Sequence, residues 1–344
     1  MKDEKAFSVS QLLKQIARNL VLHGSSYENP GLWYGKTGMA VFLFHYGRYS
    51  GNKQFDDYAI EMISSIQEGL HWGSEVNYKN GLAGIGAGIE YLSQNGFLDI
   101  DTNEILEDFD PRIRDEILYR KHDNKSLGMG LCGLGQYLLY RINYSFSGVN
   151  ELRLLTNRER ILYVVNIIEN EGIPPTNELP DVLLFLCRLY HLDICNPKIE
   201  RYLDKLLKEF SYNDIRNGNQ SAWVLALLRL ISIRNQTVNL IERLIVEVLQ
   251  SIDSTDALST NNGFADTVNR LLWLLQCKKL IKKTCTNTNI YNHLEILTDK
   301  TIRQATDSLG YEKNTLSLMG YSGAGLALMT VSGDCDDTWL DLLM

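Results

Sequence analysis

The amino-acid sequence predicts an all-α protein, a barrel or toroid of seven helical hairpins with an inner and an outer ring of helices, (α/α)7. Two observations predict this fold. A short glycine-containing core recurs along the chain, and the helices between the cores alternate between amphipathic and almost wholly apolar. Because no obvious linker or low-complexity tract interrupts the repeat, we expect residues 1–344 to form a single domain.

The recurring core has the pattern G-x-x-[G/A]-x-x-x-[aromatic or Ala]-Leu. Four copies are clear, in residues 31–43, 81–92, 130–138 and 320–328, and three weaker copies begin at Asn177, Asn219 and Gly263. Anchored at residues 35, 84, 130, 177, 219, 263 and 320, successive copies lie 42 to 57 residues apart, which leaves room for two helices and two turns. Seven helical hairpins are therefore predicted.

The helices between the cores are predicted to face solvent on one side. Residues 55–66, 199–210 and 240–249 carry apolar side chains at the i, i+3, i+4, i+7 spacing of an amphipathic helix. The segments that open at the cores differ, since residues 39–44 are apolar nearly all round, which is typical of a buried helix. This alternation predicts an outer ring around an inner ring.

The glycines at the start of each inner helix have two possible explanations. Glycine inside a helix costs about 1 kcal/mol relative to alanine, so its recurrence indicates a specific need. Small residues would let the inner helices pack closely. Alternatively, bare helix N-termini at one end of the barrel, which we call the rim, would offer unpaired N–H groups to a ligand.

The composition argues against several functions. The net charge of −8 and the lack of a basic stripe argue against a nucleic-acid surface. No stretch approaches 18 consecutive apolar residues, so no membrane span is expected. The charged start, MKDEKAFSVS, lacks the apolar region of a secretory signal, and the six cysteines include no CxxC pair. We therefore expect a cytoplasmic protein with reduced thiols.

The glycine cores resemble those of the lanthionine synthetase C-like (LanC-like) family. The resemblance rests on the Gly-Leu motifs of the first hairpins and on Gly-Tyr-Ser-Gly at residues 320–323, and it covers roughly residues 10 to 340. It implies an (α/α)7 barrel, in agreement with the repeats counted above. It also implies lantibiotic biosynthesis, in which family members use zinc to add a peptide cysteine thiolate across a dehydrated residue, closing a thioether ring.

The positions that the resemblance assigns to zinc carry other residues in this chain. Asn261, Leu318 and Met319 stand where the family has its Cys, Cys and His ligands, and none of the three is a normal zinc ligand. No cofactor is therefore expected. The place of the family's catalytic histidine falls on Thr176, and that of its acidic partner falls on Ser126.

Candidate site residues remain near the second and third cores. His71, His122 and Asp123 lie in the loops before these cores and are the candidates for catalysis. Four aromatic residues near the cores are candidates for a peptide-binding rim, namely Trp33, Tyr34, Trp72 and Tyr321. Each of these residues has a structural alternative, as a solvent-facing or packing side chain.

The resulting hypothesis is a divergent LanC-like protein of a peptide-maturation system, a pseudoenzyme without cyclase activity. Its expected partners are a precursor peptide or a modifying enzyme of the same pathway. Two alternatives remain. One is an active cyclase with an unrecognised metal site, for example His71, His122, Asp123 and Cys132. The other is a hydrolase or lyase that uses acids near the rim, among Glu75, Glu90, Asp123, Asp181 and Asp266.

Overall fold

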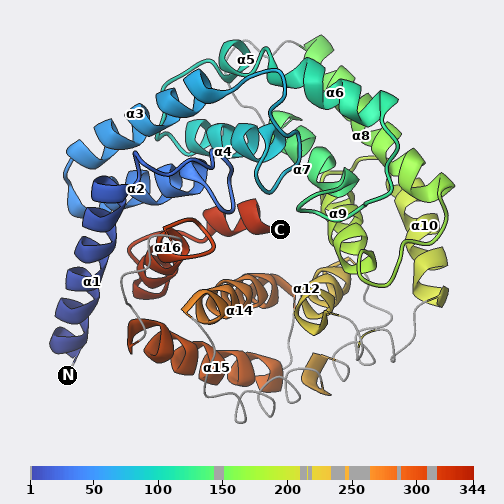
Figure 1. Ribbon diagram of the computed structural model, residues 1–344. Helices are drawn as coiled ribbons and strands as arrows, with labels where there is room; N and C mark the ends of the chain where they lie inside the picture. Colours follow the sequence, from blue (N-terminus) through green and yellow to red (C-terminus); the bar gives the residue numbers. More distant parts are fainter. Residues whose placement is uncertain are drawn as a thin grey trace. The chain divides into compact units, whose positions relative to one another are not determined.

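The computed structural model describes residues 2–142, 151–209, 215, 219–233, 245–247, 264–284, 288–307 and 316–344. Throughout these ranges the regular elements are helices, so the predicted all-α class is confirmed (Figure 1). None of the described helices is both long and apolar enough to cross a membrane. The predicted helix at 240–249 lies largely outside the described residues.

The chain divides into two compact units, and each is described by itself. Unit 1 comprises Met1–Arg112, Asn262–Leu272 and Thr298–Leu343, and unit 2 comprises Ile113–Asn261, Trp273–Leu297 and Met344. The closed ring and the single domain remain predictions.

The helices of unit 1 come from both ends of the chain. They are α1 (Lys2–His23), α2 (Lys36–Ser50), α3 (Gln54–Gly69), α4 (Leu82–Gln94), α5 (Thr102–Ile105), α16 (Tyr321–Ser332) and the 3-10 helix η3 (Thr338–Leu343). Unit 2 contains α7 (Leu131–Ile142), α8 (Glu151–Asn170), α9 (Leu179–His191), α10 (Asn196–Glu209) and α12 (Gln220–Ile231). Parts of α6 (Phe109–Tyr119), α14 (Phe264–Thr284) and α15 (Thr288–Asp307) belong to each unit.

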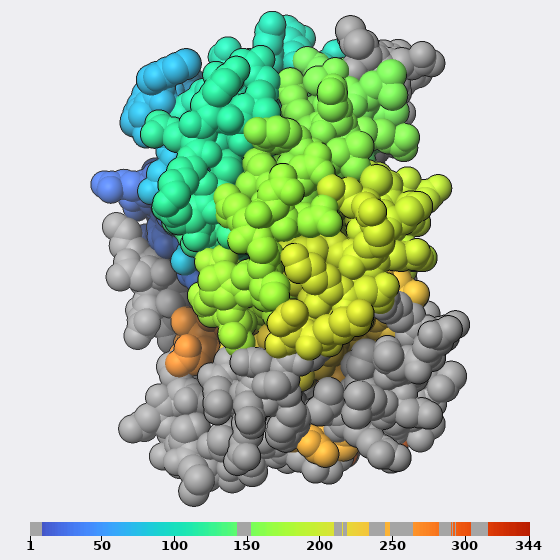
Figure 2. Space-filling view, turned by 90° about the vertical axis from the view of Figure 1, so that its right-hand side faces the viewer, coloured from blue at the N-terminus to red at the C-terminus, as the bar shows by residue number. Residues whose placement is uncertain are grey.

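The two predicted kinds of helix are both present. The helices that open at the clear cores are buried on all sides, over residues 37–47 of α2, 82–92 of α4, 131–141 of α7 and 321–329 of α16. In contrast, α3 and α10 bury only one face, formed in α10 by Ile199, Tyr202, Leu203 and Leu206. The other face of α10 reaches the surface, together with α8, in the view of Figure 2.

Packing within each unit follows the hairpin pattern. A buried helix contacts the amphipathic helix that follows it, as in α2 with α3, α7 with α8 and α9 with α10. It also contacts buried helices of other hairpins: α2 contacts α4 and α16, and α9 contacts α7 and α12. Glycines sit at these contacts, since a Cβ on Gly325 would lie 2.3 Å from the Phe42 ring, and one on Gly135 would lie 2.4 Å from the Phe185 ring. Close packing between buried helices therefore accounts for Gly325 and Gly135.

The C-terminal segment is fixed to the end of α2 in unit 1. His45 Nε2 lies 2.8 Å from the hydroxyl of Tyr91, and its Nδ1 lies 3.1 Å from Cys335 Sγ. Burial lowers the pKa of His45 to about 4, against an opposing effect of Asp336. Burial also raises the pKa of Cys335 to about 12. Both groups are therefore neutral at pH 7, which makes this pair a packing contact and not an activated thiolate.

Candidate functional site

The four clear cores form the same junction between a loop and a helix. In each, a glycine precedes the helix, and its backbone is extended at Gly35 and Gly81. The loop folds back so that an early carbonyl accepts a hydrogen bond from the first turn. These bonds are Lys36 N to Asn29 O at 2.9 Å, Leu82 N to Glu75 O at 2.9 Å, Leu131 N to Asn124 O at 3.1 Å and Ser322 N to Leu316 O at 3.3 Å.

This junction corrects the predicted rim of bare helix N-termini. Several N–H groups of the first turns are already bonded to the preceding loop, and Thr37 and Ala83 add bonds to Pro30 O and Val76 O. They are therefore not free to bind a ligand. The sequence pattern could not reveal this because the acceptors are main-chain carbonyls, which any residue type can supply.

The junction also explains the first glycine of each core. A Cβ on Gly35, Gly81 or Gly130 would lie 2.4 Å from a loop carbonyl oxygen six residues earlier. The backbone φ angles of Gly35 and Gly81 are negative, so the requirement is for space and not for a left-handed conformation. The residues that directly precede the four helices are 35, 81, 130 and 320. The second core is therefore aligned with the others at residue 81, and not at residue 84 as predicted from the sequence.

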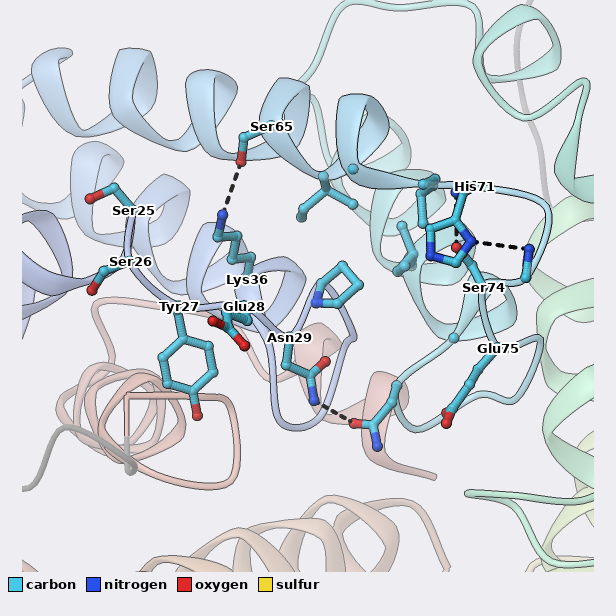
Figure 3. A pocket seen from close by; sticks show the side chains of 18 residues that line it. Ser25, Ser26, Tyr27, Glu28, Asn29, Lys36, Ser65, His71, Ser74 and Glu75 are labelled. Carbon is cyan, nitrogen blue, oxygen red and sulfur yellow. Dashed lines mark hydrogen bonds between the residues drawn. The ribbon is translucent and has the colours of Figure 1, made fainter.

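A pocket of about 870 Å³ lies in unit 1 beside the first two junctions (Figure 3). Its wall comes from the loop before α2, the first turns of α2 and α4, the end of α3 and the loop between α3 and α4. The volume is within the range of small-molecule and peptide sites. Its polar side chains include Lys36, Ser65, His71, Ser74 and Glu75.

The loop at residues 70–75 forms one edge of this pocket and is held rigidly by Arg112. The guanidinium of Arg112 donates hydrogen bonds to the carbonyls of His71, Trp72 and Ser74, at 3.2, 2.8 and 2.7 Å. It also lies 5.6 Å from the ring centre of Trp72, as in a cation–π contact. Although its main chain is fixed, the side chain of Trp72 is 86% exposed.

His71, one of the predicted catalytic residues, is exposed and lines the pocket. Its Nδ1 accepts a hydrogen bond of 3.1 Å from Gly73 N–H, so the neutral ring carries its proton on Nε2. In that tautomer Nε2–H can donate to a ligand, while Nδ1 shapes the loop.

The predicted rim aromatics separate into two groups. Trp72 and Tyr34 are exposed, and Tyr34 receives the Lys79 ammonium at 4.6 Å from its ring centre. Trp33 is only half-buried but donates from Nε1 to Leu342 O at 3.2 Å, which ties it to the C-terminal segment. The prediction for Tyr321 is wrong, since this side chain is buried and its ring lies 4.7 Å from that of Phe264.

The other predicted catalytic residues lie in unit 2, outside the pocket. His122 Nε2 is 2.9 Å from Ile117 O, which closes the turn after α6. Asp123 pairs with Lys121 at 2.6 Å, and both side chains are well exposed. Cys132, the thiol of the hypothetical metal set, is completely buried, which raises its pKa well above the usual range.

The rim acids occupy different environments. Glu75 lines the pocket and accepts a bond of 2.6 Å from Asn77 Nδ2. Glu90 is fully buried and accepts a bond of 3.2 Å from Gln94 Nε2. Asp181 accepts the N–H of Leu127 at 2.7 Å, and burial, followed by the Glu178 charge, raises its pKa to about 6 despite this bond. Asp266 is exposed.

The positions implied for zinc do not fit the metal. Leu318 is fully buried and a Cβ on Gly38 would lie 2.6 Å from its Cβ, so an apolar side chain fills this place. Met319 donates its backbone N–H to Trp33 O at 3.1 Å. Asn261 lies outside the described residues. Among the residues that the structure describes, no group of three or more His, Cys, Asp or Glu side chains could hold a metal ion. The hypothetical set of His122, Asp123 and Cys132 with His71 is therefore not formed.

No protein-family model matches this chain, and no curated protein matches it at a significant level.

Two residues of the site, one in the pocket wall and one that supports its loop, are not singled out by the sequence motifs. Lys36 follows the first glycine of its core and lines the pocket, and Arg112 holds the Trp72 loop. Aligning the cores at positions 35, 81, 130 and 320 would have identified Lys36, because the next residue is Leu, Leu or Tyr in the other three copies. No such signal exists for Arg112, because it donates its hydrogen bonds to main-chain carbonyls, which any residue type supplies.

Proposed function

We propose that the protein is a divergent LanC-like α/α toroid that binds a precursor peptide or a modifying enzyme of a lanthipeptide-type maturation pathway. In this proposal it works in the cytoplasm, without zinc and without cyclase activity. The family assignment rests on the glycine cores. Their shared junction and the contacts of α2 with α3, α4 and α16 are compatible with neighbouring hairpins in a ring.

Two observations carry the binding function: the pocket of about 870 Å³, and the exposed Trp72, which belongs to the loop at the pocket's edge although its own side chain does not line the pocket. Large aromatic side chains dominate the binding energy of many protein interfaces. Arg112 fixes the loop that presents Trp72, so the ring can engage a partner with little loss of main-chain freedom. His71 Nε2–H and the hydroxyls of the wall would add polar contacts to a peptide backbone.

The absence of cyclase activity is proposed from the residues at the zinc positions. A buried leucine cannot coordinate zinc, and a thioether is a soft, weak ligand for it. Without the metal, the family's route to a substrate thiolate near neutral pH is missing. Elemental mass spectrometry of untagged protein, purified without chelator, tests this part, and near-stoichiometric zinc would contradict it.

The binding function is tested with the full-length protein and the peptides and enzymes encoded beside its gene. We expect at least one of them to bind, and Trp72→Ala to weaken that binding about tenfold, which is within the range of a moderate interface anchor. Tyr119→Ala is the matched control, since Tyr119 is 79% exposed but lies at the end of α6 and not in the loop at the edge of the pocket. Failure of every candidate to bind the wild-type protein would refute the proposal.

A further inference from the structure

Lys36 differs from its counterparts in the other clear cores. The residue after the first glycine is Leu82, Leu131 or Tyr321 in those cores, and each of these side chains is buried. Lys36 holds the same place at the start of α2 but is only partly buried and lines the pocket. The fold thus accepts an apolar residue here, and the lysine is not needed to build the junction.

The ammonium of Lys36 has weak compensation within the protein. Its Nζ lies 3.4 Å from Ser65 Oγ, and that hydroxyl donates its own hydrogen to Met62 O at 2.8 Å. In the part of the chain that the structure describes, no carboxylate lies within ion-pair distance of Nζ. The first turn of α2 contains no acidic residue. A cation at a helix N-terminus is also disfavoured by the helix dipole. A carboxylate from a ligand would supply a counter-charge to Lys36 and would also interact favourably with the N-terminal end of the α2 dipole.

Carboxylates line other parts of the same pocket. Figure 3 shows Glu75 well separated from Lys36 across the view, whereas Glu28, which also contributes to the wall, is drawn beside Lys36. The only hydrogen bond of the Glu75 carboxylate among the described residues comes from the neutral amide of Asn77. The ammonium of Lys36 and the carboxylate of Glu75 therefore do not neutralise each other, and no ion pair joins Lys36 to Glu28.

We infer that this pocket binds a peptide segment bearing both a carboxylate and an ammonium group, the carboxylate on Lys36 and the ammonium on Glu75. Charge-assisted hydrogen bonds of this kind are stronger than neutral ones, and a partly enclosed site screens them less than open solvent does. The inference rests on the proposed peptide-binding function and specifies which chemical groups of a peptide the site selects.

Three small probes separate the two contacts. They are the tripeptide Ala-Ala-Ala with free ends, its C-terminal amide, which lacks the carboxylate, and its N-acetyl form, which lacks the ammonium. Binding is measured by NMR titration of the full-length protein at low ionic strength. We expect the free tripeptide to bind at least about tenfold more tightly than either blocked form, since each blocked form loses one charge-assisted contact.

Variants of the two residues complete the test. Lys36→Met introduces an apolar residue like those in the other cores, so we expect it to fold normally. Its affinity for the free tripeptide should be about tenfold lower than that of the wild type, and its affinity for the C-terminal amide should be unchanged. Glu75→Gln should lower the affinity for the free tripeptide by a similar factor and leave the affinity for the N-acetyl form unchanged. Lys53→Gln is the control, because Lys53 is exposed and does not line the pocket.

The outcomes distinguish this inference from the proposed function. If the wild-type protein does not bind the free tripeptide, or if Lys36→Met weakens all three probes equally or none, the inference is overturned. The proposed function still stands in that case if a pathway peptide or enzyme binds. Conversely, the expected probe pattern without any binding of pathway components supports the charged pocket and refutes the proposed pathway role.

Discussion

Replacing Gly84 with alanine perturbs the junction between the second core and its loop. Gly84 lies in the first turn of α4, where a Cβ would be 1.8 Å from the carbonyl oxygen of Tyr78 and 3.1 Å from the Cβ of Leu32. The first distance is far below any normal contact. Because the nearest atom belongs to the main chain, a side-chain rotation cannot relieve the clash, and the loop must move away from the helix.

The magnitude follows from the hydrogen bonds that this movement breaks. The loop accepts bonds from Gly81 N, Leu82 N and Ala83 N, at 3.1, 2.9 and 3.2 Å. At about 1 kcal/mol net for each bond, their loss costs about 3 kcal/mol. Alanine recovers about 1 kcal/mol through its higher helix propensity. We therefore expect Gly84→Ala to lower the free energy of unfolding by about 2 kcal/mol.

Urea denaturation of the full-length protein, followed by far-UV circular dichroism, measures this change. Gly69→Ala is the matched control, since Gly69 is also helical but a Cβ there would meet no atom within 4 Å. We expect the control to be as stable as the wild type or slightly more stable. If Gly84→Ala is as stable as Gly69→Ala, the close approach of loop and helix is refuted as the reason for this glycine.

Three further predictions concern the rim and the titrating groups. Trp72→Ala should leave the thermal midpoint within about 1 °C of the wild type, because a single exposed substitution changes stability little, and a large loss would contradict the exposed position of this ring. His45 has a folded pKa of about 4, below the 6.5 of a free histidine, so its neutral form stabilises the native state above pH 6.5 and this stabilisation is lost as the pH falls towards 4. The stability advantage of the wild type over His45→Gln, measured by urea denaturation across this window, should therefore shrink as the pH falls, and a constant difference would refute the buried neutral ring. The pH dependence of stability due to Asp181 has the opposite sign. Its folded pKa of about 6 exceeds the ordinary 3.8, so the native state loses stability as the pH rises between these values. Asp181→Asn should become progressively more stable relative to the wild type over that window, and parallel pH profiles would argue against the raised pKa.

The hairpins were predictable because the spacing of apolar residues in the sequence indicates which face of each helix is buried. In α3 the i, i+3, i+4 spacing predicts the buried face formed by Ala59, Met62, Ile63 and Ile66. The almost wholly apolar stretch at residues 39–44 likewise predicts the buried α2. The arrangement of the hairpins depends on long-range packing, which periodicity alone does not encode.

The site was predictable only in part. His71, in the loop before the second core, lines the pocket, while its expected role in catalysis stays a prediction. The direction of Tyr321 was missed because an aromatic residue at a helix start can face solvent or the core with equal ease. Comparison with Leu82 and Leu131 at the equivalent positions indicates the core. The roles of Arg112 and of the loop carbonyls depend on contacts between distant segments that no local pattern records.

The main-chain character of the four junctions has a consequence for how this protein can diverge. Each helix start is secured by carbonyl oxygens, together with a glycine that leaves room for them. Most loop side chains can therefore change without loss of the junction, whereas the glycines cannot. A library of variants selected only for folding should tolerate many residue types at positions 36, 71 and 72 and almost none but glycine at 35, 81 and 130. Such an architecture allows a new ligand preference to evolve at the pocket while the supporting framework stays constant.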